Sequence, residues 1–234
     1  IAQKRKIKIC SFSMKKKNCE VNLDYIKKNG LKYKVSINVN NKKKYFNFNS
    51  NFESDIKNLL AAVLIISIFK DIMKLDENIF YNHKTPSGRG DISKIKIFKK
   101  NIYLVDESYN SNPLSLRLAL KNFDSMRVNQ AKKHIILGDM LELGRHSKKL
   151  HKAISKNINN TSINNVNLIG KYMKDVYKIL HKNKRGLILR NSSEIISLIK
   201  NDINNNDYLM IKGSNSTGLN KLTNDLKMGK INAL

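Results

Sequence analysis

Hydrophobic and polar positions alternate with period two in the first fifty residues, most clearly in KYKVSINV and YFNFN, which NNKKK joins. Such alternation predicts a half-buried strand on each side of a turn, so we expect an antiparallel hairpin. A continuous apolar run from Leu59 to Phe69 follows. It is shorter than the roughly 20 residues of a membrane span. It therefore predicts a buried helix, with Ser54 or Asp55 as its N-cap.

The segment NHKTPSGRGD, from Asn82 to Asp91, gathers Pro, Gly and Ser and predicts a domain boundary, with a hinge at Pro86–Gly90. We expect one domain over 1–84 and a second over 85–234. After the boundary, IKIFKKNIYLV predicts a hairpin, and apolar stretches then alternate with amphipathic ones. We expect strands at His134–Asp139, Val166–Gly170, Gly186–Arg190 and Asp207–Gly213, and helices at Leu114–Met126, Ser147–Asn157, 172–180, 192–200 (capped by Ser192 or Ser193) and Gly218–Lys227.

Repeated strand–helix units with short connections are typical of a mostly parallel sheet that helices cover on both faces. The fold class that the pattern predicts is therefore α/β, with a Rossmann-like second domain. The run IYLVDESYNSNP, from Ile102 to Pro113, is the most informative stretch of that domain. A buried parallel strand that ends in polar residues just before a helix is where open α/β sheets bind ligands. The alternative is that these residues only turn the chain and cap the next helix.

Composition narrows the functional classes. Of the 234 residues, 41% are hydrophobic and the mean hydropathy is -0.46, as in ordinary globular proteins. The formal net charge is +27, from 45 basic and 18 acidic residues. Such a charge suggests nucleic-acid binding, but the lysines are scattered over all elements and accompany an excess of Asn and Ile. We therefore expect no nucleic-acid partner, although a basic nucleic-acid-binding Rossmann-like protein stays an alternative.

The termini and cysteines add three expectations. Ile1 is not a start methionine, which suggests a piece of a longer protein, and the first residues carry no signal-peptide pattern. Cys10 and Cys19 form no CxxC pair, so we expect free thiols in a reducing compartment. No membrane insertion is expected, and the 234 residues contain no GxxxxGK[ST] phosphate loop.

Three runs carry a resemblance to a known family. DESYNSNPLSLRLAL is similar to DDSYNANPxSMxxAL, HIILGDMLELGRHSKKLH to VLGDMLELGxxSxxxH, and IKGSNSTGL to VKGSRSxxM/L. The three family runs occur in this order in the D-alanyl-D-alanine-adding ligases of the Mur ligase family. The resemblance begins near Lys32 and continues to the carboxyl terminus. It implies that 1–84 is the last part of a central ATP-binding domain and that 85–234 is the carboxyl-terminal Rossmann-like ligase domain.

The resemblance also implies an activity. These enzymes use ATP and Mg²⁺ to join D-alanyl-D-alanine to UDP-N-acetylmuramoyl-tripeptide through an acyl phosphate, in the bacterial cytoplasm, during peptidoglycan precursor synthesis. We expect a monomer, with metal ligands and phosphate loop outside these 234 residues, so the chain alone should be an inactive half. A sibling Mur ligase that adds one amino acid remains an alternative, and the third residue of the peptide, diaminopimelate or lysine, stays open.

Site residues follow from the resemblance one at a time. For the nucleotide it implies Asn58, Asp106, Glu107 and the catalytic Arg89, whose guanidinium would reach the γ-phosphate on domain closure. Ser54 and Asp55 replace the usual His and Asn near Asn58. A helix-capping Asn58 and a solvated Arg89 are the alternatives. For the peptide and the dipeptide, the resemblance implies Tyr109, Asn110, Asn112, Asp139, Glu142, Lys212 and Ser214, with His151 facing the same cleft.

Overall fold

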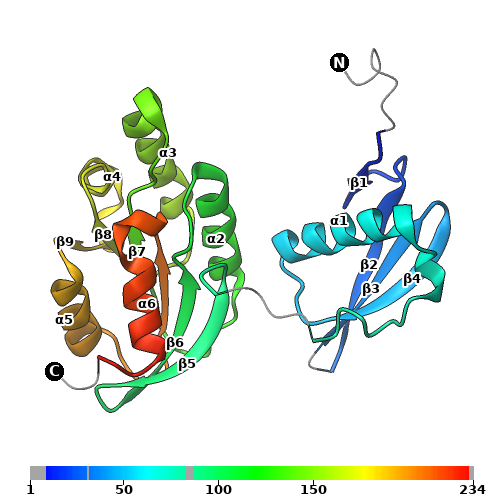
Figure 1. Cartoon of the computed structure of the whole chain (residues 1–234). Helices are drawn as coiled ribbons and strands as arrows, with labels where there is room; N and C mark the ends of the chain where they lie inside the picture. The colour runs from blue at the N-terminus through cyan, green and yellow to red at the C-terminus, as the bar shows by residue number, and fades with distance from the viewer. Residues whose placement is uncertain (1–8, 31, 83–86, 232–234) are drawn as a thin grey trace. The chain divides into compact units, whose positions relative to one another are not determined.

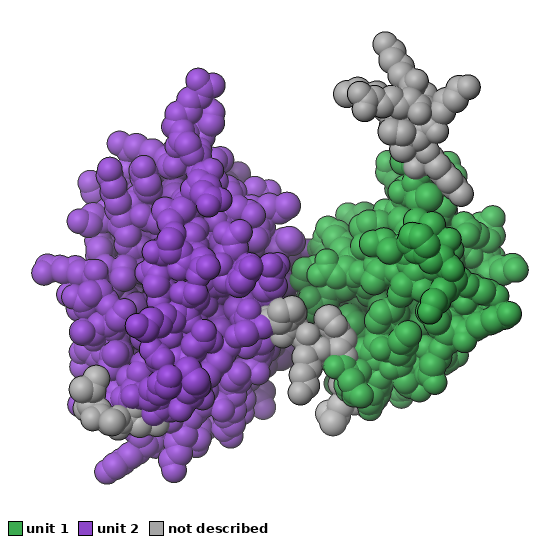
Figure 2. Space-filling model, in the orientation of Figure 1, with its two compact units in different colours: residues 1–84 green, residues 85–234 purple. Residues whose placement is uncertain are grey.

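The chain forms two compact units, 1–84 and 85–234 (Figure 2). A computed structural model describes residues 9–30, 32–82 and 87–231, and each unit is considered by itself. Pro86, in the hinge expected from the sequence, lies outside these ranges. Within them, no helix combines the length and the apolar character that crossing a membrane requires. Both Cys10 and Cys19 are free thiols, as expected.

Unit 1 is built on a four-stranded sheet in the order β1-β2-β3-β4 (Figure 1). Its strands are Phe12–Ser13, Val21–Asn29, Lys32–Val39 and Lys42–Phe48. The last two form the predicted antiparallel hairpin. Asn40 and Asn41 make its turn at φ 47° and 66°, a left-handed backbone that Asn tolerates. Strand β2 was not predicted, because a bulge between Leu23 and Tyr25 breaks its alternation.

Helix α1, Glu53–Phe69, covers one face of this sheet (Figure 1). Its Ile56, Leu60 and Val63 are fully buried in a core that also contains β3 and β4 side chains. The predicted cap was wrong. Phe52 is the N-cap residue and offers no side-chain hydrogen bond, so the backbone turns into the helix before Ser54. A short 3-10 turn, Ile72–Lys74, follows the helix.

Unit 2 is built on a six-stranded sheet in the order β5-β6-β10-β7-β8-β9. Only β5 is antiparallel, to β6. The parallel strands confirm the Rossmann-like α/β fold predicted from the sequence. The hairpin β5–β6 turns at Phe98 and Lys99, both with positive φ. The strands are β5 Asp91–Ile97, β6 Lys100–Glu107, β7 Lys133–Gly138, β8 Asn165–Ile169, β9 Arg185–Leu189 and β10 Tyr208–Lys212.

Helices pack against both faces of this sheet (Figure 1). Successive strand residues point to opposite faces, so Val105 lies in the core under α2, α3 and α4, whereas Leu104 lies in the core under α5 and α6. The predicted caps of α5 were wrong, because Asn191 accepts the hydrogen bond from Glu194 N. The helices are α2 Pro113–Ser125, α3 Ser147–Asn159, α4 Met173–Ile179, α5 Ser192–Asp202 and α6 Leu219–Lys227.

Candidate functional site

The carboxyl ends of β6, β10 and β7 lie side by side in unit 2. Strand β10 is last in sequence but pairs between the other two, with Lys212 opposite both Glu107 and Leu137. This reversal of strand order is the place where open α/β sheets bind ligands. The three sequence motifs therefore converge on one edge. A hollow of about 510 Å³ opens there, lined by Tyr109, Asn110, Leu141, Glu142, Ser214, Asn215 and Ser216.

Two glycines allow the strand ends to approach closely. A Cβ on Gly138, the last residue of β7, would lie 2.8 Å from a methyl carbon of Leu219 in α6. A Cβ on Gly213, after β10, would lie 2.7 Å from the same atom. Real Cβ atoms do not approach so closely, so a side chain at either position would displace the Leu219 methyl group from its present packing. The glycines of GDMLELG and IKGSN thus serve helix packing beneath the hollow.

Lys212 is buried below this edge, with 1% of its surface exposed. Its Nζ donates to the Asn110 carbonyl oxygen at 2.8 Å and to Glu107 Oε2 at 3.2 Å. Burial lowers the pKa of Lys212, and the Glu107 carboxylate offsets part of that effect, while the charge of Arg89 lowers the pKa further. Lys212 is predicted from the resemblance to bind substrate; in the structure its buried ammonium contacts Glu107 and the Asn110 backbone.

Ser214 joins three loops at the same edge. Its Oγ accepts from Leu141 N at 2.9 Å and donates to the Ser111 carbonyl oxygen at 3.3 Å. The hydroxyl of Ser111 is buried and has no hydrogen-bond partner within the described part of the chain. A buried hydroxyl without a partner is costly, and in native proteins such groups often mark functional places. Ser111 was not among the residues expected from the sequence, because Ser in a turn gives no distinct signal.

Arg89 stacks on Tyr109 at the end of β6. The guanidinium carbon lies 4.4 Å from the centre of the Tyr109 ring, which itself is 48% exposed and lines the hollow. This cation–π contact leaves the guanidinium exposed while limiting its movement. The permanent charge of Arg suits a phosphate oxygen. The structure thus brings Arg89 to the same edge as Glu107, although the two are 18 positions apart.

Glu142 lines the hollow from the β7 side with an exposed side chain. Its φ is 61°, the left-handed region that costs a non-glycine residue about 1–2 kcal/mol. Leu141 N, held by Ser214, fixes the loop just before it. Positive φ also occurs in the β5–β6 turn at Phe98 and Lys99, but Glu142 combines it with a place in the lining of the hollow.

Asp106 and Asn112, in contrast, are occupied by structural contacts. Asp106 is 1% exposed, and its carboxylate contacts Lys227 Nζ at 2.5 Å and Ser108 Oγ at 2.5 Å. Asn112 Oδ1 accepts from Ser115 N, and Ser115 Oγ accepts from Asn112 N, which is a capping box at the start of α2. For these two residues the capping and turn alternative describes the observed contacts.

Asp139 and His151 also serve the architecture. The Asp139 carboxylate accepts hydrogen bonds from the backbone N–H groups of Lys171, Tyr172 and Met173 at the start of α4. His151 is fully buried; its Nε2 accepts from Met140 N at 2.9 Å and its Nδ1 donates to the Ser147 carbonyl oxygen at 2.7 Å. The expectation that His151 faces the cleft was wrong, because both ring nitrogens hold the β7–α3 connection.

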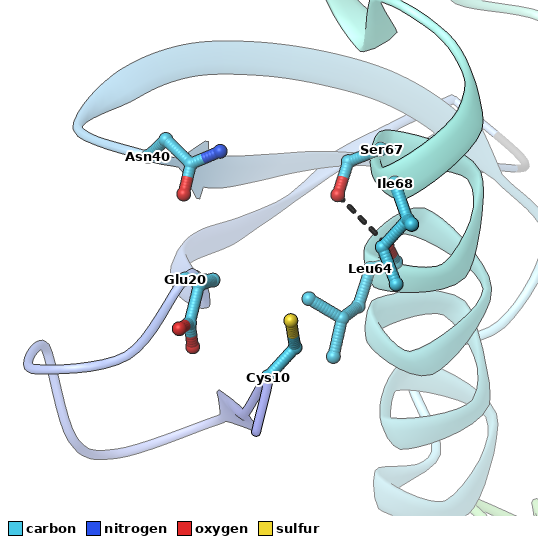
Figure 3. Close-up of a pocket in the computed structure, with 6 residues that line it drawn as sticks. All are labelled: Cys10, Glu20, Asn40, Leu64, Ser67 and Ile68. Carbon is cyan, nitrogen blue, oxygen red and sulfur yellow. Dashed lines mark hydrogen bonds between the residues drawn. The ribbon is translucent and has the colours of Figure 1, made fainter. Parts of the chain in front are cut away.

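Asn58 lies in unit 1, with its side chain exposed in the second turn of α1. It is inside the helix, so the capping alternative for Asn58 was wrong. A second hollow in this unit, about 340 Å³, is lined by Cys10, Glu20, Asn40, Leu64, Ser67 and Ile68 (Figure 3). Ser67 Oγ donates to the Leu64 carbonyl oxygen, and the Glu20 carboxylate accepts from Ser11, so these two polar groups have local partners.

Four residues around the site were not singled out in the sequence. Leu141, Asn215 and Ser216 stand inside the motif runs and line the hollow, and Lys227 reaches Asp106 from α6. Their positions depend on which strand ends the fold brings together, and periodicity does not reveal that. Lys227 was indistinguishable from the other lysines of this basic chain.

Curated relatives that match the chain include D-alanyl-D-alanine-adding ligases. The chain is 28% identical over 165 residues to UDP-N-acetylmuramoyl-tripeptide--D-alanyl-D-alanine ligase of Rickettsia prowazekii, a match that covers 70% of the chain and 35% of that protein. It is 33% identical over 133 residues to the enzyme of the same name from Buchnera aphidicola of Acyrthosiphon pisum, covering 56% and 28%. The chain thus spans about a third of the length of these relatives.

Solved structures show the same fold. A MurF ligase of Thermotoga maritima in complex with ADP matches with a TM-score of 0.75 at 16% identity, over 98% of this chain and 51% of that one. MurF from Acinetobacter baumannii matches with a TM-score of 0.73 at 20% identity, over 96% and 48%. The family described as Mur ligase, glutamate ligase domain, matches residues 94–215. Since that match covers more than half of the 234 residues, the chain belongs to the Mur ligase family.

Proposed function

We propose that this chain is the closing half of an ATP-dependent ligase that adds D-alanyl-D-alanine to UDP-N-acetylmuramoyl-tripeptide in peptidoglycan precursor synthesis. One observation carries the proposal: three motifs that are distant in sequence meet at one hollow, with Tyr109 and Asn110 from the first, Glu142 from the second and Ser214 from the third. The named relatives support the choice of substrates, because each is called a D-alanyl-D-alanine ligase of this precursor.

The residues at this edge divide into two groups. Arg89 and Glu107 are assigned to the nucleotide: the guanidinium to the γ-phosphate, and the carboxylate to the ribose hydroxyls. Tyr109, Asn110, Glu142 and Ser214 are assigned to the peptide and the incoming dipeptide. Glu142 is the exposed carboxylate among the lining residues and suits the ammonium group of D-alanyl-D-alanine. Asn58, on unit 1, is assigned to the adenine side.

In the proposed reaction, a carboxylate oxygen of the tripeptide attacks the γ-phosphorus and ADP leaves, giving an acyl phosphate. The D-alanyl-D-alanine amine then attacks the acyl carbon, loses a proton and expels inorganic phosphate. Phosphoryl transfer of this kind is accelerated mainly by positioning and by stabilising charge. The stacking of Arg89 on Tyr109 and the hydrogen bonds that hold the loops after β6, β7 and β10 contribute such positioning. The mechanism needs no side-chain nucleophile.

Two parts of the reaction are not assigned to these residues. No GxxxxGK[ST] loop occurs in the 234 residues. The described residues contain no cluster of three or more His, Cys, Asp or Glu that could hold a metal ion, so we assign none of them to Mg²⁺. The chain by itself is therefore expected to be inactive. A monomer working in the bacterial cytoplasm is the corresponding expectation for the complete enzyme.

The test joins this chain to the amino-terminal part of the Rickettsia prowazekii relative. We expect ATP-dependent ligation of D-alanyl-D-alanine to the UDP-muramoyl tripeptide by the fusion and none by the 234 residues alone. Arg89→Ala should lower kcat by at least a hundredfold, whereas Arg117→Ala, on α2 outside the hollow, should leave it within twofold. Ligation of single amino acids in place of the dipeptide would favour the sibling ligase. Full activity of Arg89→Ala would remove Arg89 from the site.

A further inference from the structure

Lys227, the last residue of α6, contacts residues on both sides of Arg89 in the chain. Its Nζ lies 2.5 Å from Asp91 Oδ2, 2.5 Å from Asp106 Oδ2 and 3.2 Å from Ser87 Oγ. Ser87 lies in the segment before β5, Asp91 is the first residue of β5, and Asp106 lies near the end of β6. The Lys227 side chain is 17% exposed, that of Asp106 1% and that of Asp91 22%. Both ion pairs are therefore largely shielded from solvent.

The Asp91 carboxylate contacts both Lys227 and the backbone beside Arg89. Its other oxygen, Oδ1, accepts from Gly88 N at 2.7 Å. Gly90 N donates to the Asp106 carbonyl oxygen at 2.7 Å, and Tyr109 N donates to the Gly88 carbonyl oxygen at 3.0 Å. The backbone on both sides of Arg89 is therefore held: Gly88 by Asp91 and Tyr109, and Gly90 by Asp106 of β6.

The fit of this segment is close. Gly88 has φ 78°, and a Cβ there would lie 2.9 Å from Tyr109 Cβ. Gly90 has φ 94°, and a Cβ there would lie 3.0 Å from Glu107 Oε1. Only glycine combines these backbone angles with so little space. A small outward movement of the segment would separate the Arg89 guanidinium from the Tyr109 ring.

The charge of Lys227 opposes such a movement. The Asp91 and Asp106 oxygens can be no more than 5.0 Å apart, because both lie 2.5 Å from the same Nζ. Two carboxylates at that separation repel each other strongly when shielded from water. Burial acts to lower the pKa of Lys227, but hydrogen bonds to Asp106 and Asp91 outweigh it and raise the pKa. The cation is thus present at neutral pH, and it lies between the two carboxylates and offsets their mutual repulsion.

We propose that Lys227 is a positioning residue, which by bridging Asp91 and Asp106 holds the segment 87–91 against β6 and so sets the place of the Arg89 guanidinium. Lys227 does not touch the hollow itself and acts through Arg89. The inference deepens the proposed function, on which the role of Arg89 toward phosphate rests, but the bridge is testable without any activity.

The first experiment measures amide hydrogen exchange in the 234-residue chain. Lys227→Met should speed exchange at Gly88, Gly90 and Tyr109 at least tenfold, while β10 amides keep their protection. Lys221→Met, which removes an exposed lysine of the same helix, should change none of them. Lys227→Arg should restore protection. If Lys227→Met does not fold, Asp91→Asn keeps the Asp106 pair and should speed Gly88 alone. Unchanged exchange at Gly88 in both Lys227→Met and Asp91→Asn would overturn the proposal.

The second experiment uses the active fusion and a double-mutant comparison. Lys227→Met should lower kcat about tenfold with the KM for D-alanyl-D-alanine unchanged, and Lys227→Arg should recover most of the loss. Combined with Arg89→Ala, Lys227→Met should add less than twofold, because its effect passes through Arg89. Additive losses would overturn the positioning role. If instead Arg89→Ala has no effect while the exchange result holds, the bridge stands and the proposed role of Arg89 fails.

Discussion

The two ends of the unit 2 sheet both bury charge, and the hollow described above lies at the carboxyl end. At the amino end, His134 Nε2 lies 3.1 Å from Asp207 Oδ2, and both side chains are almost fully buried. Asp207 also accepts from Lys132 N and Asn204 N. These bonds tie the residue before β7 to the loop before β10. At the carboxyl end, Lys212 and Lys227 hold carboxylates and backbone around the 510 Å³ hollow.

This difference shows how buried charge should be interpreted here. A buried charged group with hydrogen-bond partners indicates that a segment is held in place, and both ends contain such groups. At the carboxyl end the segments so held present exposed groups, such as Tyr109 and Glu142, to a hollow. The buried cations are therefore supports for the site, and the groups assigned to ligands lie above them.

The largest expected effect comes from removing a carboxylate at the carboxyl end. Asp106→Ala leaves the Lys227 ammonium short of its most buried partner and deprives Ser108 of its acceptor. Breaking a buried pair in this way costs about 3–5 kcal/mol. Urea denaturation of unit 2, followed by exchange of its core amides, measures the loss. Asp202→Ala, an exposed control on α5, should change stability by less than about 0.5 kcal/mol. A loss below 1 kcal/mol for Asp106→Ala would contradict the supporting role of the pair.

A smaller expected effect concerns backbone strain, which we compare at the carboxyl and amino ends of the unit 2 sheet. Glu142 at the carboxyl end and Asn206 at the amino end have φ 61° and 67°. Glu142→Gly should stabilise unit 2 by about 1 kcal/mol, because glycine removes the left-handed penalty. Asn206→Gly should give much less, since Asn already tolerates this backbone. Thermal unfolding of both variants tests the comparison. Equal gains would show that strain is not concentrated at the site, and in the fusion Glu142→Gly should raise the KM for the dipeptide.

The smallest effect concerns pH at the amino end. Burial lowers the pKa of His134, and hydrogen bonding to Asp207 offsets only part of that shift. Between the lowered folded value and the ordinary 6.5, the unfolded chain binds the proton more readily than the folded one. Stability should therefore fall as pH drops below about 6.5. His134→Gln should weaken this dependence, whereas His146→Gln, on an exposed turn, should not. A flat profile in the parent chain between pH 5 and 7 would argue against a neutral buried His134.

Much of the architecture followed from local patterns. The hairpin at β3–β4 and the strand–helix alternation after the boundary were predicted, since period-two and helical periodicity report which side of an element is buried. The predicted helix caps were wrong. The N-cap residues are Phe52 and Asn191, although Ser54, Ser192 and Ser193 also have side chains suited to capping. The point where the backbone turns into a helix depends on tertiary packing. Strand β2 escaped notice because its bulge shifts the alternation.

The candidate site was predictable in location and only partly in roles. The polar run after β6 marked the right edge, because strand ends of a parallel sheet share one edge. The same residue types serve as ligand groups and as caps, so Asp139 and Asn112 could not be separated from Glu142 and Asn110 by sequence. Their hydrogen bonds separate them: the first two are occupied by backbone N–H groups at helix starts.

By itself, the sequence determined the α/β fold, the motif order and the family. Local periodicity specifies elements, and GDMLELG and its companion runs are distinctive strings. Only the tertiary structure decided which strand ends meet and what lies beneath them. Strand β10 enters the sheet between β6 and β7, bringing Lys212 under Glu107 across 105 positions. Helix α6 likewise brings Lys227 to Asp106 across 121 positions. Such long-range contacts are settled by strand order and helix packing, which no local pattern encodes.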